Sequence, residues 1–181
     1  MFRGAWKRFA LAVVIVLAAV VPTGAVAASA APNSRVVAVA SLESGVLSEM
    51  NKIRRSHGLQ ALRLSTALGS AARQHSQSMA TQGYFSHSSA DGSEFWKRVK
   101  AFYPQGRFGY WSVGENLLWQ SPDVDAAGAL QMWMNSPPHR ENLLTARWRE
   151  VGISAVHVAA APGTYDGLDV TIVTADFGVR H

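Results

Sequence analysis

Two histidines and one glutamate have surroundings that could support chemistry. His87 and His139 each follow a turn or helix-ending signal and lie among small and polar residues. We expect both in loops, where a rigid scaffold usually carries its binding groups. Glu115 lies between them in the otherwise apolar segment 111–119, where an unpaired charge would be costly. An imidazole, a metal ion or backbone amides could be its partner, and the spacing alone does not match a local metal motif such as H-E-x-x-H.

The other four histidines are interpreted as structural or solvated. His57 and His181 are expected in solvent, at a helix end and at the C-terminus. His157 falls within a strand pattern, which favours a place at the surface or the edge of the core. His75 lies on the apolar side of a helical pattern, where a hydrogen-bonded histidine at the core edge is the expected role.

Helical periodicity predicts three helices in the first half of the chain. Apolar residues recur at helical spacing over 42–53, and Arg54 is assigned to the opposite, charged face. Ser65 is a favourable N-cap for a second helix, which Gly83 would end. A short amphipathic helix is expected after the turn at 91–93.

Strand patterns dominate the second half. Residues 111–119 predict one strand, while 151–159 and 168–177 predict a hairpin. Between them, Asp123 is expected to cap a helix that the Pro137–Pro138 pair stops, because proline cannot continue a helix interior. This order of helices and strands indicates an α+β layered domain with an antiparallel sheet.

The net charge depends on whether the first segment is counted. The 181 residues hold 17 Lys and Arg, 12 Asp and Glu and no cysteine, with a formal net charge of +5. Arg3, Lys7 and Arg8 belong to the N-terminal segment, so the rest of the chain carries 14 − 12 = +2. Its basic residues form no stripe, which argues against a nucleic-acid partner. The lack of cysteine excludes disulfides, thiolate zinc sites and cysteine nucleophiles.

The first 30 residues have the order of a secretory signal peptide. A basic stretch precedes the apolar run 9–21, and small residues then allow cleavage after Ala27 or Ala30. The alternative is an uncleaved membrane anchor, although the run is shorter than the roughly 20 residues that a spanning helix needs. No membrane-spanning segment is expected after cleavage. The expected division is a signal peptide at 1–30, a linker at 31–41 and one domain at 42–181.

Four segments in order resemble motifs of the CAP superfamily of cysteine-rich secretory proteins, antigen 5 and pathogenesis-related proteins. They are Tyr84–His87, Gly114–Asn116, Trp133–Leu144 and Glu150–Ile153. The resemblance extends over residues 42–178 and is strongest to the exported, cysteine-free bacterial branch. It implies a three-layer α–β–α sandwich around a mainly antiparallel sheet, which agrees with the predicted order of elements.

The resemblance also implies a central cleft lined by two histidines and two glutamates, in which the histidines hold a divalent metal. The matching positions here are His87, Glu115 and His139, and Ser136 replaces the second glutamate. His87 and His139 are then the expected ligands of Zn²⁺ or another divalent ion. Glu115 keeps four alternative roles: third ligand, acceptor orienting a histidine N–H, general base on a metal-bound water, or organiser of the cleft.

These features favour a secreted, monomeric CAP-domain binding module, either free outside the cell or attached to the cell wall. Its ligand would be a lipid, a cell-wall component or a protein. One alternative is a metal-dependent hydrolase acting on peptides or cell-wall polymers, which the missing second glutamate and the lack of an activated serine or cysteine oppose. The other is a wall-associated structural protein.

Overall fold

The computed structural model describes residues 35–181, so the expected signal peptide lies outside the described residues. Within them, five strands form one sheet in the order β1-β4-β5-β3, with the short β2 beside β4. The β2–β4 pair is parallel and the other three pairs are antiparallel. The strands are β1 (Val36–Ala38), β2 (Arg63–Leu64), β3 (Trp111–Gln120), β4 (Glu150–Val158) and β5 (Val170–Arg180).

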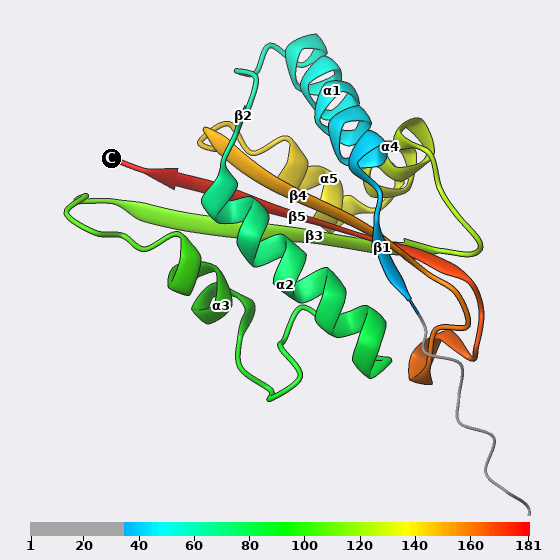
Figure 1. The fold of residues 1–181 in the computed structure, drawn as a ribbon. Helices are drawn as coiled ribbons and strands as arrows, with labels where there is room; N and C mark the ends of the chain where they lie inside the picture. The colour runs from blue at the N-terminus through cyan, green and yellow to red at the C-terminus, as the bar shows by residue number, and fades with distance from the viewer. Residues whose placement is uncertain (1–34) are drawn as a thin grey trace, which may run out of the picture. The chain divides into compact units, whose positions relative to one another are not determined.

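Helices cover both faces of this sheet, as Figure 1 shows. On one face, α1, α4 and α5 pack together, and on the other α2 packs with α3. The bounds are α1 (Ala40–Ser56), α2 (Thr66–Gln82), α3 (Phe95–Phe102), α4 (Ala126–Asn135), α5 (Pro137–Leu143) and a 3₁₀ turn at Gly163–Tyr165. The predicted α+β sandwich of three layers with a mainly antiparallel sheet is confirmed. Among residues 35–181, no helix is both long enough and apolar enough to cross a membrane.

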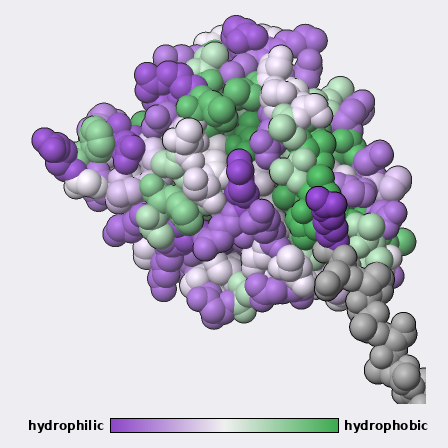
Figure 2. All heavy atoms as spheres, viewed as in Figure 1, coloured by the Kyte–Doolittle hydropathy of each residue, from purple (hydrophilic) through white to green (hydrophobic). Residues whose placement is uncertain are grey.

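The two faces of the sheet have different cores. The face under α1 and α4 is apolar, and it buries Trp133 and Trp148 among aliphatic side chains. The face under α2 is apolar toward the end of α2 but polar near its middle, where His75 and Ser76 are buried. The outer side of α2 is hydrophilic, and hydrophobic side chains gather between α1 and α2 (Figure 2).

Helix α2 is fixed at both ends and pressed against the sheet. Ser65 Oγ accepts a hydrogen bond from Leu68 N at 3.4 Å, and Gly83 ends the helix with φ of 70°, as the sequence predicts. A Cβ on Gly152 of β4 would lie 2.0 Å from the backbone of Leu68 and Gly69. The lack of a side chain at Gly152 therefore allows the first turn of α2 to contact β4 directly.

Two expectations for the N-terminal part are wrong. Part of the expected linker is strand β1, whose Val37 pairs with His157 at the outer edge of β4. Arg54, which we assigned to the solvent face of α1, is fully buried. Its Nη1 donates to Leu143 O at 2.7 Å and Thr145 O at 3.1 Å. Carbonyls at the end of α5 need donors, so Arg54 supplies a cap rather than a surface charge.

The region after β3 also differs from the prediction. The N-cap of α4 is Asp125 rather than Asp123, and its Oδ1 accepts from Gly128 N at 2.7 Å. Helix α4 ends at Asn135 as expected, but Pro137 then begins the separate helix α5. Proline is favoured at a first helical position because its missing N–H would lack an intrahelical partner there. This second helix carries His139.

Candidate functional site

A cleft of about 460 Å³ lies at β3, the last strand in the sheet order. The loop before α3 and the start of α3 form one wall, and the start of α5 forms the other. The cleft is lined by His87, Phe95, Gly114, Glu115, Asn116, Pro138, His139 and Asn142. The structure therefore brings together His87, Glu115 and His139, which come from a loop, a strand and a helix. Ser136 contacts His139 and lines an adjoining hollow.

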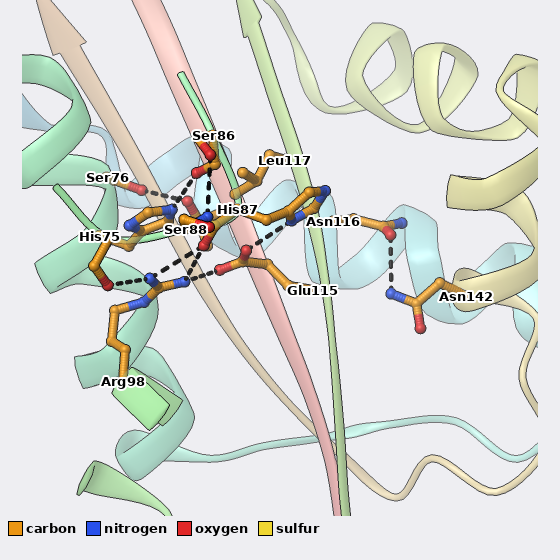
Figure 3. A network of polar contacts seen from close by, with 12 residues as sticks. His75, Ser76, Ser86, His87, Ser88, Arg98, Glu115, Asn116, Leu117 and Asn142 are labelled. Carbon is orange, nitrogen blue, oxygen red and sulfur yellow. Dashed lines mark hydrogen bonds and ion pairs between the residues drawn. The ribbon is translucent and has the colours of Figure 1, made fainter. Parts of the chain in front are cut away.

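Glu115 is buried and has both carboxylate oxygens engaged. Its side chain is 1% exposed, and Oε1 accepts from His87 Nδ1 at 2.8 Å. Its Oε2 forms an ion pair with Arg98 Nη2, as Figure 3 shows. The partner that the sequence required for Glu115 is thus an imidazole together with a guanidinium. Among the four alternative roles, this geometry fits an acceptor that orients a histidine N–H.

Arg98 is the functional residue of α3 that the sequence reasoning missed. It is buried, and besides Glu115 it donates from Nη1 to Ser89 Oγ at 2.9 Å and to His87 O at 3.4 Å. It therefore fixes the loop that carries His87 as well as the carboxylate that holds the imidazole. The missed signal is helical spacing, because Arg98 follows Phe95 by three residues and lies on the same, inward side of α3.

His139 is held by neutral groups. Its Nδ1 lies 2.8 Å from Ser136 Oγ, and its carbonyl accepts from Asn116 Nδ2 at 3.0 Å. Asn142 Nδ2 donates in turn to Asn116 Oδ1 at 2.9 Å (Figure 3). Trp148 Nε1 donates to Asn142 O at 2.9 Å. Burial lowers the pKa of His139, and the nearby His87 lowers it further. The asparagines therefore tie α5 to β3.

The two imidazoles are held in the same way. Each uses Nδ1 for a protein partner, which is the arrangement usual for histidine ligands of metals, and neither Nε2 has a hydrogen-bond partner within residues 35–181. In that same range, no group of three or more His, Cys, Asp or Glu could hold a metal. A cation in this cleft would therefore have two protein ligands and would take its others from water or from a bound ligand.

A second buried carboxyl lies behind Glu115. Asp176 of β5 is its direct cross-strand partner and is fully buried, and within residues 35–181 no N–H or hydroxyl group donates to either of its oxygens. The Glu115 carboxylate lies within hydrogen-bond reach of the Asp176 carboxyl. Burial, and then the charge of Glu115, raise the pKa of Asp176 well above its usual range. The sequence held a signal for it, because the inward alternation of Val170 and Ile172 continues to residue 176.

The remaining histidines lie outside the cleft. His75 is buried, and its Nε2 donates to Ser86 O at 2.8 Å. Burial lowers the pKa of His75 to about 4. His57 and His181 are exposed as expected, and His157 forms a hydrogen bond with Thr171 Oγ1 at 3.1 Å. His75 thus supports the loop that carries His87 without reaching the cleft itself.

Comparison with known proteins agrees with the fold and the motifs. The CAP profile, described as the cysteine-rich secretory protein family, matches residues 47–177. The protein YkwD of Bacillus subtilis is 29% identical over 128 residues, which cover 71% of this chain and 46% of YkwD. The membrane protein YlbC of the same organism is 31% identical over 111 residues, 61% of this chain and 30% of YlbC. The matched region is therefore less than half the length of these relatives.

Solved structures give the same result. An extracellular protein containing an SCP domain from Bacillus anthracis superposes with a TM-score of 0.59 and 28% identity, over 76% of this chain and 40% of that one. An outer surface protein of Borrelia burgdorferi superposes with a TM-score of 0.63 and 19% identity, over 82% and 99% of the two chains, and shares the fold. With the profile match over most of the chain, these findings show that the protein belongs to the CAP family of cysteine-rich secretory proteins.

Proposed function

We propose that the protein acts outside the cell as a binding module, and that His87 and His139 bind a divalent cation such as Zn²⁺ in its cleft. The observation that carries the proposal is the shared arrangement of the two imidazoles. Each is fixed at Nδ1, by Glu115 or by Ser136, and each keeps Nε2 without a protein partner in the described residues. A cation held by two imidazoles retains open positions, through which a lipid, a cell-wall component or a protein would bind.

Two features support action outside the cell. The first 30 residues have the order of a secretory signal peptide. The similar protein from Bacillus anthracis is described as extracellular. Wall attachment and free diffusion are both compatible with these features, and cell fractionation separates them.

The state of Glu115 favours binding over hydrolysis. A general base must reach the water that it activates. Here the Glu115 side chain is 1% exposed, and its two oxygens are occupied by His87 and Arg98. Activation of water would require the carboxylate to leave a buried ion pair, which is costly. We therefore place Glu115 as the group that orients His87.

Calorimetric titration of the purified protein with Zn²⁺ tests the proposal. We expect binding by the wild-type protein and its loss in the double variant His87→Ala/His139→Ala. Glu115→Gln should weaken binding by about 10- to 100-fold, the usual effect of removing a residue that orients a ligand. The control is His57→Ala/His181→Ala, which removes two exposed histidines outside the cleft and should bind as the wild type does. Equal Zn²⁺ affinity in the two double variants would rule out the cleft as the metal site.

A further inference from the structure

Asp176 lies beneath α2 in a position that no solvent reaches. On the same face of β5, Thr174 accepts a hydrogen bond from Ser76 of α2 at 2.8 Å. On the other side, a Cβ at Gly178 would lie 3.0 Å from Leu68 of α2. Asp176, between these two residues, is therefore covered by the helix, and its side chain is 0% exposed.

The charges around Asp176 can be counted element by element. Arg98 of α3 supplies a positive charge and Glu115 of β3 a negative one, and these two form the ion pair described above. His75 of α2 is neutral near pH 7, because burial lowers its pKa to about 4. On β4, the residue paired with Asp176 is Gly152, which has no side chain. One cation thus faces two carboxyls, and Glu115 is the one that contacts it.

An ionised Asp176 would be a buried charge without a compensating partner. Within residues 35–181 neither of its oxygens accepts a hydrogen bond from an N–H or hydroxyl group, whereas ionised carboxylates in protein interiors are paired and hydrogen-bonded. The hydrogen bond open to Asp176 is with Glu115, and it requires a proton on one of the two carboxyls. Ionisation would also place two negative charges on adjacent strands, since Asp176 and Glu115 are register partners. Both effects raise the pKa of Asp176 well above its usual range.

We propose that Asp176 is a protonated, neutral acid at physiological pH and that it acts as a positioning residue of the cleft through Glu115. With Asp176 neutral, Glu115 carries the negative charge that Arg98 balances and that orients His87. The charge state of Asp176 thereby sets the pH range over which this arrangement holds. The consequence for cation binding rests on the proposed function, whereas the charge state itself does not.

Because folding is linked to protonation, a protonated Asp176 predicts the direction in which the stability of the protein changes with pH. Below the ordinary pKa of an aspartate, near 3.8, the folded and unfolded states both hold the proton. As the pH rises above it, the unfolded chain releases the proton and the folded protein keeps it, so the wild-type protein loses stability until the folded-state pKa is reached. Asp176→Asn keeps the shape of the side chain and removes this loss.

The test is a pH series on the metal-free protein in the presence of a chelator. In carboxyl-carbon NMR, we expect Asp176 to keep the shift of a protonated acid at about pH 7, where an aspartate in an unfolded peptide has the shift of a carboxylate. We also expect the Tm of Asp176→Asn, relative to wild type, to increase with pH by about 3 °C per unit from about pH 4 upward. Asp123→Asn, the matched control, should follow the wild-type profile.

Two outcomes would overturn the proposal. One is an Asp176 signal that reaches the carboxylate shift in the pH range of an aspartate in an unfolded peptide. The other is a Tm difference between Asp176→Asn and wild type that does not change with pH, which is the result of a merely structural role. If the variant fails to fold, the NMR titration of the wild-type protein still decides. Because no metal is present, failure of Zn²⁺ binding at His87 and His139 leaves this result unaffected.

Discussion

The two halves of the cleft hold their histidines by different physics. His87 is fixed by charge, since its imidazole contacts Glu115 and Glu115 forms a buried ion pair with Arg98. His139 is fixed by neutral groups, through the hydroxyl of Ser136 and the amide of Asn116. The charged half lies on the α2 and α3 side of the sheet and the neutral half on the α5 side.

Because of this difference, breaking a contact should cost a different amount of stability in each half, and the two halves should respond differently to pH. A buried ion pair that loses one member leaves an uncompensated charge, which is among the most costly defects in a protein interior. A neutral hydrogen bond that is lost costs the desolvation of one or two dipoles. The charged half also interacts electrostatically with His75 and Asp176, two groups with displaced pKa values, whereas the neutral network around Asn116 contains no titratable member besides His139.

Arg98→Met should have the largest effect. It leaves the carboxylate of Glu115 buried without its cation, and we expect a loss of about 3–5 kcal/mol in the free energy of unfolding. The double variant Arg98→Met/Glu115→Gln removes the stranded charge and should recover part of that loss. Urea unfolding at neutral pH measures both. A double variant no more stable than the single one would show that the charge is not what makes this half costly.

The loss of folding free energy at acidic pH should be the next largest effect, and it tests the pH response of the charged half. The folded-state pKa of His75 is about 4, below the usual 6.5, so the unfolded chain binds a proton that the folded protein does not. As the pH falls from about 6.5 to about 4, the folded state loses roughly 3 kcal/mol on this account. His75→Gln, which can still donate to Ser86 O, should reduce that loss in urea unfolding at a series of pH values.

The matched control for His75→Gln is His57→Gln, which changes an exposed histidine in the same way. This control variant should lose stability at acidic pH to the same extent as the wild-type protein. The effect of Asp176 has the opposite sign, because the unfolded chain releases the Asp176 proton as the pH rises while the folded protein keeps it. His75→Gln and Asp176→Asn therefore alter the pH profile of stability in different directions. If His75→Gln loses as much stability at acidic pH as the wild type does, His75 does not contribute to the pH response of the charged half.

The neutral half of the cleft was largely predictable from the sequence. His139 and the two asparagines lie in motifs whose order resembles the CAP pattern, and in the structure the asparagines tie α5 to β3. Helix periodicity, the Ser65 cap and the alternation of the final strand also predicted most of the fold. These features are local, so a single segment contains the information that specifies them.

The charged half was predictable only in part, because it is assembled from segments far apart in the chain. The strand pattern showed that Glu115 needs a partner, but the pairing of β3 with β5 is what places Asp176 beside it. The sequence did not single out Arg98, and it placed Arg54 on the charged face of its helix, but both are buried. A charged residue on the inward side of a short helix is ambiguous without the layer that covers it. The missed residues are therefore those whose role depends on tertiary contacts.

Asn116→Ala should have the smallest effect and is the sharpest test of the neutral half. It removes the donor to His139 O and the acceptor for Asn142, and we expect a loss of about 1–3 kcal/mol in urea unfolding. Neither amide titrates, so this loss should be the same at about pH 5 and pH 7. If the stability loss of Asn116→Ala changed with pH as strongly as the loss caused by His75, Asn116 would be coupled to the charges across β3. The two histidines would then be held by one network, and the division of the cleft into a charged and a neutral half would fail.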